Sequence, residues 1–267
     1  MIPKIINYCW FGRNPLPDLA IKCIESWKKY LPEYEIKEWN EDNFDVNIIK
    51  YTKQAYEAKK YAFVSDYARF WILYHYGGVY FDTDVEVIKP MDEIIQRGPF
   101  MGCECSGSDT TTIDVAPGLG LGVYSGCNLY KELLELYSKQ SFFKNNGTLN
   151  TKTIVQYTTE LLIFHGLKNI NEVQKCEGIW IYPKEYFCPL DYYSGIMEIT
   201  EKTYCIHHYC ASWLSEEKKY ANKITQKLNV FPYSLRYRVG NFVAAVKYRG
   251  LFNGIKELLG FIYKKIS

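Results

Sequence analysis

Two aspartates, Asp82 and Asp84, follow the apolar residues 79–81 with one residue between them. Because residues i and i+2 of a strand point to the same side, both carboxylates are expected to converge on one object. Two neighbouring negative charges at the end of a core strand are costly unless a cation joins them. Mg²⁺ and Mn²⁺ prefer carboxylate oxygens and keep positions open for phosphate oxygens. The pattern therefore predicts a divalent metal that can hold a diphosphate leaving group.

An Asp-x-x-Arg pair, Asp66 and Arg69, lies in the apolar stretch 65–76 just before these aspartates. An N-terminal serine, helical spacing and a Gly-Gly end predict a helix here, with both side chains on one face. Asp66 is suited to accept hydrogen bonds from sugar hydroxyls, and Arg69 to fix Asp66 or to stabilise developing negative charge. The alternative is that the aspartates are merely solvated at a strand end, with Arg69 as a salt-bridge partner.

Two histidines and two tryptophans are further candidates, as metal ligands and as stacking residues. His207 and His208 lie in the late segment 204–213, and at most one of them faces the metal because neighbouring strand residues point opposite ways. Imidazole suits Mn²⁺ or Fe²⁺ better than Mg²⁺. Trp10 and Trp213 stand beside loops, where an indole either completes the core or stacks on a nucleobase.

The order of the expected elements favours an α/β fold. The expected strands are residues 2–10, 35–39 and 79–81, and the expected helices between and around them are residues 18–30, 52–63 and 65–76. Such alternation is typical of a sheet that is mostly parallel at its start, where ligands bind at the carboxyl ends of the strands. Trp10 and the two aspartates fall at that end. The glycine-rich run 116–124 is not a phosphate-binding loop, and the sequence contains no serine-nucleophile, H-E-x-x-H or dinucleotide-binding motif.

Composition indicates one medium domain, or one domain with an appendage. The chain has 267 residues, of which 48% are hydrophobic and 23% charged. Its nine cysteines include no C-x-x-C pair, so free thiols in a reducing compartment are expected. Residues 1–11 lack a long apolar run, and no stretch of about 20 apolar residues follows. We therefore expect a cytoplasmic protein.

The distribution of charge separates residues 1–222 from a basic tail, residues 223–267. The tail carries nine Lys or Arg and one acidic residue, which leaves 23 basic and 29 acidic residues in the remainder. The net charge of +2 gives no indication of a nucleic-acid partner. The tail is expected either to lie as an amphipathic helix on an anionic membrane, at its inner face, or to pack as a helical subdomain with a solvated basic face.

Three segments together resemble the DXD-motif sugar transferases, a family of yeast-type initiating mannosyltransferases, bacterial capsule and lipopolysaccharide transferases, and glucosylating clostridial toxins. The segments are IPKIINYCWFG (2–12), SDYARFWILYHYGGVYFDTDVE (65–86) and HHYCASW (207–213). The resemblance covers roughly residues 2–213. It implies a GT-A fold, a nucleotide-sugar donor used with Mn²⁺ or Mg²⁺, and retention of anomeric configuration.

The resemblance also implies roles for the residues that match its central motifs. Trp10 is similar to the indole that stacks on the donor base. Asp66 and Arg69 look like the pair that holds the ribose and sugar hydroxyls of the donor. Asp82 and Asp84 match the DXD motif, in which the second aspartate is the more direct metal ligand.

Residues later in the chain match the family less specifically than the central motif does. Ser212 and Trp213 resemble a mobile C-terminal segment that closes over the diphosphate. His208 is similar to a metal-binding histidine of related retaining galactosyltransferases, and Asn150 stands where the family often has an asparagine near the sugar. One departure is Asn7, where the family more often has His, so an ionisable group near the donor base is replaced by an amide.

The chemistry of retention remains open at this stage. Double displacement needs a nucleophile near the anomeric carbon, and Asp114 and Asp191 are candidates. The family is usually discussed in terms of front-face attack assisted by the leaving phosphate, so no nucleophile is assigned.

The sequence therefore predicts a metal-dependent retaining glycosyltransferase. Its expected donor is a UDP-sugar, favoured over GDP-mannose, and its expected acceptor is a glycan or lipid-linked glycan in bacterial capsule or lipopolysaccharide synthesis. Two alternatives are a catalytically silent carbohydrate-binding or scaffold protein and, less favoured, a D-x-D phosphatase. The phosphatase pattern needs Thr or Val where Glu86 stands.

Overall fold

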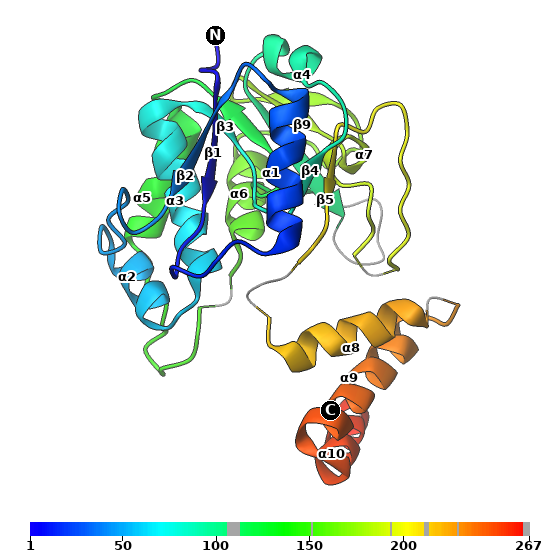
Figure 1. Ribbon diagram of the computed structural model, residues 1–267. Helices are drawn as coiled ribbons and strands as arrows, with labels where there is room; N and C mark the ends of the chain where they lie inside the picture. Colours follow the sequence, from blue (N-terminus) through cyan, green and yellow to red (C-terminus); the bar gives the residue numbers. More distant parts are fainter. Residues whose placement is uncertain (106–112, 151, 193, 211–213, 229, 264–267) are drawn as a thin grey trace. The chain divides into compact units, whose positions relative to one another are not determined.

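The computed structural model describes residues 1–105, 113–150, 152–192, 194–210, 214–228 and 230–263 (Figure 1). The chain divides into two compact units. The larger unit comprises Met1–Pro189 and Glu198–His208, and the smaller comprises Leu190–Met197 and Tyr209–Ser267.

A mixed sheet forms the centre of the larger unit, in the order β2-β1-β3-β7-β5-β9-β8, with β6 paired to β5. Its strands are β1 (Ile5–Cys9), β2 (Glu35–Trp39), β3 (Gly78–Tyr80), β5 (Phe100–Cys105), β6 (Ile113–Val115), β7 (Leu121–Val123), β8 (Gln174–Cys176) and β9 (Ile179–Tyr182). Strand β1 is parallel to β2 and β3, and β5 is parallel to β9, whereas the pairs that involve β6, β7 and β8 are antiparallel. This confirms the expected α/β class with flanking helices and a parallel start.

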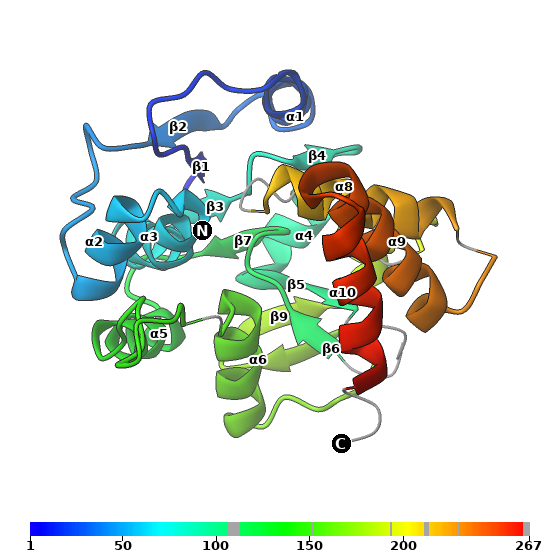
Figure 2. The same ribbon diagram turned by 90° about the horizontal axis from the view of Figure 1, so that it is seen from below.

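Helices cover both faces of this sheet (Figure 2). They are α1 (Asp18–Tyr30), α2 (Lys50–Glu57), α3 (Tyr61–Tyr76), α4 (Asp92–Arg97), α5 (Asn128–Ser138), α6 (Ile154–Phe164) and the short α7 (Lys184–Phe187). Helix α3 begins four residues before the predicted cap Ser65, whose hydroxyl instead donates to Tyr61 O at 3.3 Å. It ends at Gly77, which has φ +66°, a left-handed conformation that glycine adopts without strain.

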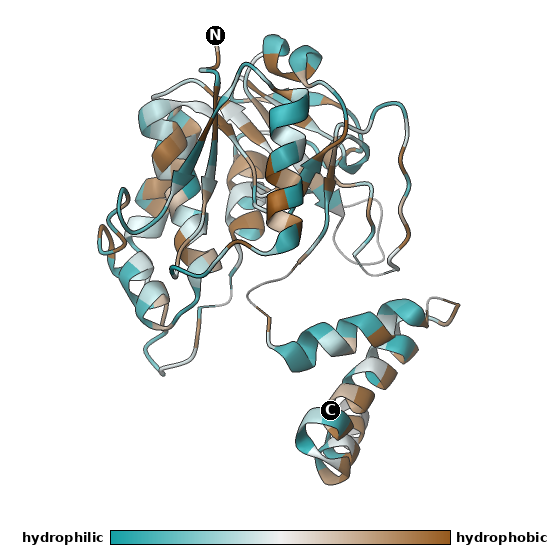
Figure 3. Cartoon of the chain, in the orientation of Figure 1, coloured by the Kyte–Doolittle hydropathy of each residue, from teal (hydrophilic) through white to brown (hydrophobic). Residues whose placement is uncertain are grey.

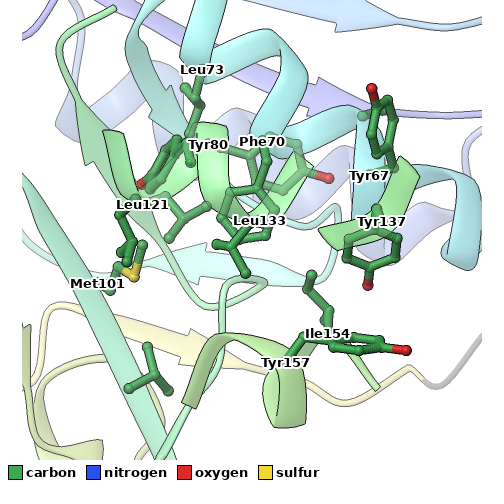
Figure 4. Packing of buried hydrophobic residues seen from close by; sticks show 14 of the residues in the cluster. Tyr67, Phe70, Leu73, Tyr80, Met101, Leu121, Leu133, Tyr137, Ile154 and Tyr157 are labelled. Carbon is green, nitrogen blue, oxygen red and sulfur yellow. The ribbon is translucent and has the colours of Figure 1, made fainter. Parts of the chain in front are cut away.

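The hydrophobic core lies between the sheet and helices α3, α5 and α6. Figure 4 shows side chains of α3, among them Phe70 and Leu73, packed toward Leu133 of α5 and Leu121 of β7. On α1, Trp27 is fully buried, and its ring lies against Tyr8 with centroids 5.8 Å apart. The apolar periodicity of α1 and α3 thus fixes the helices against the strands that end at the candidate site.

A second, two-stranded sheet joins distant parts of the sequence. Strand β4 (Val85–Val87) pairs antiparallel with β10 (Cys205–His207), with Val85 opposite His207. The indole of Trp27 donates to Val85 O at 2.8 Å and so ties this pair to α1. The late histidines are thereby brought beside the residues that follow β3.

The smaller unit contains three helices in the part of it that the structure describes. They are α8 (Glu216–Lys227), α9 (Tyr233–Arg249) and α10 (Leu251–Tyr263). Ser215 caps α8 by accepting from Lys218 N–H, and a β-carbon on Gly240 of α9 would lie 2.3 Å from Thr225 Oγ1 of α8, so glycine permits this close helix contact. Figure 3 shows that α8 is largely hydrophilic and that apolar residues concentrate in α9 and α10. Among the described helices, none combines the length and the apolar character needed to cross a membrane.

Asn7 is a buried polar connection between the first three strands of the sheet. Its side-chain nitrogen donates to Val79 O at 3.2 Å, and its side-chain oxygen accepts from the Trp39 indole at 2.8 Å. The residue is 1% exposed, so these groups have no water to replace a lost partner. The residue that departs from the family pattern therefore serves the packing of the sheet in this chain.

We predict that Asn7→Ala lowers the free energy of unfolding by about 1–3 kcal/mol, because the Trp39 indole loses its acceptor inside the core. Urea unfolding followed by tryptophan fluorescence measures this loss. The exposed Asn47→Ala is the matched control and is expected to change stability by less than about 0.5 kcal/mol. Equal stability of both variants would contradict this role.

Candidate functional site

Asp82 and Asp84 lie in the turn that joins β3 to β4. Strand β3 ends at Tyr80, and within the turn Val85 N–H donates to Asp82 O at 3.0 Å. The geometric premise for convergence was wrong, because these aspartates are not in a strand and do not follow its alternation. Each carboxylate has partners of its own, described below.

Arg69 connects the Asp-x-x-Arg helix to this turn. Its guanidinium Nη2 lies 3.0 Å from Asp66 Oδ1 and 3.2 Å from Asp82 Oδ1, and its Nη1 donates to Asp82 Oδ2 at 3.3 Å. The Arg69 Nε donates to Ser65 O at 3.1 Å. With its side chain only 4% exposed, Arg69 is held from three directions. The pairing of Asp66 and Arg69 on one face of α3 is as the spacing predicted.

Burial governs the electrostatics of this pair. Desolvation raises the pKa of Asp66 to about 7, although Arg69 acts in the opposite direction. Burial by itself lowers the pKa of Arg69, but Asp82, Tyr80 and Asp66 outweigh it and raise the pKa, so the guanidinium remains charged. The site therefore combines a fixed cation with a carboxyl group that titrates near neutral pH.

A glycine-rich loop approaches Asp82 from the other side. Asp82 N–H donates to Gly118 O at 3.0 Å, and a β-carbon on Gly118 would lie 2.1 Å from Asp82 Oδ2. Any larger residue at position 118 would displace the carboxylate. The run 116–124 has no phosphate-binding pattern in the sequence, and its closely spaced glycines before β7 are the only sequence signal of this contact.

The two late histidines contact different carboxylates. His207 Nε2 lies 3.3 Å from Asp84 Oδ1, whereas His208 Nε2 lies 2.8 Å from Glu86 Oε2. His208 contacts Asp84 through its backbone, because its N–H donates to Asp84 O at 3.0 Å. The imidazole beside Asp84 therefore belongs to His207. The assignment of His208 as a metal ligand stays a prediction.

Asp84 changes the protonation of its imidazole partner. Burial lowers the pKa of His207, but the Asp84 carboxylate and a hydrogen bond with Cys188 outweigh burial and raise the pKa well above its ordinary value. The pKa of Glu86 is lowered because hydrogen bonds from Lys22 and His208 outweigh its partial burial.

The remaining predicted residues are more dispersed. Trp10 follows β1, at the same sheet edge as the β3–β4 turn, and its indole donates to Asn14 O at 2.7 Å. Asn150 lies on the loop before α6, and its side chain donates to Ser141 O at 3.5 Å and to Tyr157 at 3.4 Å. Ser212 and Trp213 lie outside the described residues.

The two candidate nucleophiles lie in different units of the chain. Asp114 is in β6, opposite Glu104 of β5. Asp191 belongs to the smaller unit, where its Oδ1 accepts from Ser194 N–H at 2.6 Å. Neither observation assigns a nucleophile.

A known family matches the part of the chain that contains the Asp66–Arg69 pair and the turn after β3. Residues 17–101, which include Asp66, Arg69 and both aspartates of the turn, match the family described as "Glycosyltransferase sugar-binding region containing DXD motif". This match confirms the resemblance inferred from the sequence.

Two curated relatives come from Schizosaccharomyces pombe (strain 972 / ATCC 24843). Inositol phosphoceramide mannosyltransferase 1 is 28% identical over 111 residues, covering 38% of this chain and 33% of the relative. Inositol phosphoceramide mannosyltransferase 3 is 30% identical over 102 residues, covering 35% and 27%, respectively. The matched region thus spans about a third of the length of these relatives.

Similar solved structures include two glycosyltransferases. The "PaToxG Glycosyltransferase" has 17% sequence identity and a TM-score of 0.45, and the match covers 61% of this chain and 69% of that one. A glycosyltransferase involved in the glycosylation of the major capsid of PBCV-1 has 12% identity and a TM-score of 0.44, with 89% and 98% coverage.

We predict that Arg69→Met lowers the free energy of unfolding by about 3–5 kcal/mol, because it leaves two carboxylates without their buried cation. Combining it with Asp66→Asn is expected to restore part of the loss, since the second change removes one of the stranded charges. Urea unfolding at pH 8 measures both. The exposed Lys28→Met, which breaks a surface pair with Glu25, is expected to cost at most about 0.5 kcal/mol. A loss below about 1 kcal/mol for Arg69→Met would contradict the role of this pair.

Proposed function

Because the chain carries the sugar-binding region of the DXD-motif glycosyltransferases, we propose that it is a metal-dependent retaining glycosyltransferase that transfers a sugar from a nucleotide-sugar donor. The observation that carries this proposal is the position of Arg69. Its guanidinium pairs with both Asp66 and Asp82, and Asp82 is separated from Asp84 by a single residue of the turn. Donor binding requires a fixed cation near the diphosphate, a carboxyl group that can accept from sugar hydroxyls, and carboxylates beside them that can bind a metal.

The side chains near the turn offer ligand atoms that suit a divalent metal. Asp82 and Asp84 offer oxygen atoms, which Mg²⁺ and Mn²⁺ prefer, and the neighbouring imidazoles favour Mn²⁺ of the two. The proposed ligands are Asp84, Asp82 and His208. Such an ion supplies positive charge that neutralises the diphosphate as it leaves.

The chain's own residues would hold and orient the donor. Asp66 would accept hydrogen bonds from sugar hydroxyls, and Arg69 would keep it in place while adding positive charge near the diphosphate. Trp10, at the same sheet edge, would stack on the nucleobase. The further proposed donor contacts are Asn150, Ser212 and Trp213.

The proposed donor is a UDP-sugar in preference to GDP-mannose, but the two yeast relatives are mannosyltransferases, which makes mannose the sugar to test beside it. The proposed acceptor is a glycan or lipid-linked glycan of a bacterial surface polysaccharide, capsule or lipopolysaccharide. The relatives are named for a lipid, inositol phosphoceramide, which agrees with a lipid-linked acceptor.

We predict that the purified chain hydrolyses a UDP-sugar or GDP-mannose with Mn²⁺ and that Asp84→Ala lowers this turnover at least about 100-fold, because the diphosphate loses its metal. Release of nucleoside diphosphate measures it. The exposed Asp45→Ala is the matched control and is expected to retain turnover. Full turnover in Asp84→Ala would contradict the proposal, and no turnover with any nucleotide-sugar would favour the silent carbohydrate-binding alternative.

The helices of the smaller unit support a proposed contact with an anionic membrane surface. Among the side chains that the structure describes on α10, exposed apolar ones are Leu251, Phe252, Ile255 and Leu258. Exposed basic residues, among them Lys223 and Lys247, lie on α8 and α9. Apolar residues beside positive charge are the combination that binds a headgroup region peripherally.

We predict that replacing Leu251, Phe252 and Ile255 by Ser lowers the binding of the full chain to anionic vesicles several-fold, because the apolar contact is lost. Vesicle sedimentation measures it, and salt is expected to weaken wild-type binding through screening. Phe164→Ser, at an exposed phenylalanine of α6, is the matched control and should leave binding unchanged. Binding that is insensitive to both salt and the triple change would contradict membrane contact.

A further inference from the structure

Three side chains of different chemistry meet beside the DXD turn. Glu104 comes from β5, Cys188 follows α7, and His207 ends β10. One ligand atom from each of them, a carboxylate oxygen, a sulfur and an imidazole nitrogen, lies within 4.8 Å of the other two. Cys188 is 2% exposed, so the thiol belongs to the interior. Three separate segments therefore converge on one point, with Glu104 84 residues before Cys188 and Cys188 19 residues before His207.

Backbone contacts hold these segments in place. Tyr204 N–H donates to Tyr186 O at 2.7 Å and so aligns the chain before β10 with the residues before Cys188. The hydroxyl of Thr203 donates to Glu185 O at 2.9 Å and reinforces the same alignment. On the other side, a β-carbon on Gly102 of β5 would lie only 3.0 Å from the ring of Phe187, which shows how closely α7 packs on β5. The three ligand positions are thus built into a rigid part of the larger unit.

Asp84 orients the imidazole of this cluster. His207 Nε2 lies 3.3 Å from Asp84 Oδ1, and an imidazole that donates from Nε2 has Nδ1 on the opposite side of the ring. A cation that binds Nδ1 displaces its proton to solvent, because only the neutral ring is a ligand. Histidines that bind metals usually donate their other ring N–H to a carboxylate in this way, which fixes the tautomer and increases basicity. The arrangement is therefore that of a metal-binding histidine with its supporting carboxylate.

We propose that Glu104, Cys188 and His207 form a binding site for a thiophilic divalent cation of the Zn²⁺ class. A sulfur, a nitrogen and an oxygen ligand suit Zn²⁺, whereas Mg²⁺ and Mn²⁺ do not favour a thiolate ligand. In a tetrahedral Zn²⁺ site neighbouring ligand atoms are about 3.4–3.6 Å apart, which small side-chain rotations reach from the present separations. Three protein ligands leave a fourth position for water.

This site differs from the metal site of the proposed function. The donor metal is assigned to Asp82 and Asp84 with His208, and none of these is a ligand of the cluster. Asp84 links the two sites, because it contacts His207 of the cluster and is also a proposed ligand of the donor metal. An ion in the cluster would fasten β5, α7 and β10 together and hold His207 toward Asp84. The proposal does not depend on the transferase activity.

Cobalt spectroscopy tests the site directly. The full chain is freed of metal with a chelator, and Co²⁺ alone is titrated into it in the presence of excess Mg²⁺. We expect the intense visible bands of tetrahedral Co²⁺ together with a thiolate-to-Co²⁺ charge-transfer band in the near ultraviolet, both removed by one equivalent of Zn²⁺. Cys188→Ser is expected to abolish the charge-transfer band. Cys205→Ser, at a buried cysteine two residues before His207, is the matched control and should retain it.

Glu104→Gln tests the cluster without changing a thiol. It keeps the shape of the side chain and is expected to weaken Co²⁺ binding at least about tenfold, while Asp82→Asn leaves the charge-transfer band intact. Melting curves verify that each variant is folded. Absence of the band in the wild-type chain, or its survival in Cys188→Ser, would overturn the proposal. If the wild-type chain shows the charge-transfer band but no turnover of any nucleotide-sugar, the result would count against the proposed function and not against this cation site.

Discussion

The structure depends on a buried guanidinium that is shared by two carboxylates. Arg69 reaches from α3 to the turn after β3, pairs with Asp66 on its own helix and with Asp82 on the turn, and donates to Ser65 O. A buried charge is tolerated only when its partners are well placed, so α3 and the turn must keep their relative positions. The hydrophobic core between α3, α5 and the sheet provides this rigidity, and the Arg69 pairs in turn fix the direction of the Asp82 carboxylate.

Two small residues make this arrangement sterically feasible. Gly77 ends α3 in a left-handed conformation, which lets the chain reverse directly into β3. Gly118 allows a loop to pass against Asp82, where a methyl group would meet the carboxylate. Asn7 connects β1 to the start of β3 through its hydrogen bond to Val79 O. The backbone near the site is therefore fixed before any ligand arrives, which is the condition for electrostatic preorganisation.

The local parts of this account could be predicted from the sequence, and the long-range parts could not. Helical spacing placed Asp66 and Arg69 on one face, and the alternation of elements predicted the parallel pairing of the first strands. The turn at Asp82 was not predicted, because the three residues that follow a short apolar strand are equally compatible with a turn and with a longer strand. The partner of Asp84 was not predictable either, since it depends on the pairing of β4 with β10 across more than 100 residues. The cluster at Cys188 has no local sequence pattern, because each of its three ligands comes from a different segment.

The central claim is that this edge of the sheet binds a nucleotide-sugar through a divalent metal. A thermal-shift screen of UDP-sugars and GDP-mannose, run with Mn²⁺ and again with a chelator, tests it most directly. A donor at 100 times its Kd stabilises the folded state by about 2.7 kcal/mol, which corresponds to a rise of several degrees in Tm. We expect at least one nucleotide-sugar to raise the Tm with Mn²⁺ and not with the chelator. The claim is contradicted if no nucleotide-sugar shifts the Tm with Mn²⁺, or if the shift is the same when the metal is removed.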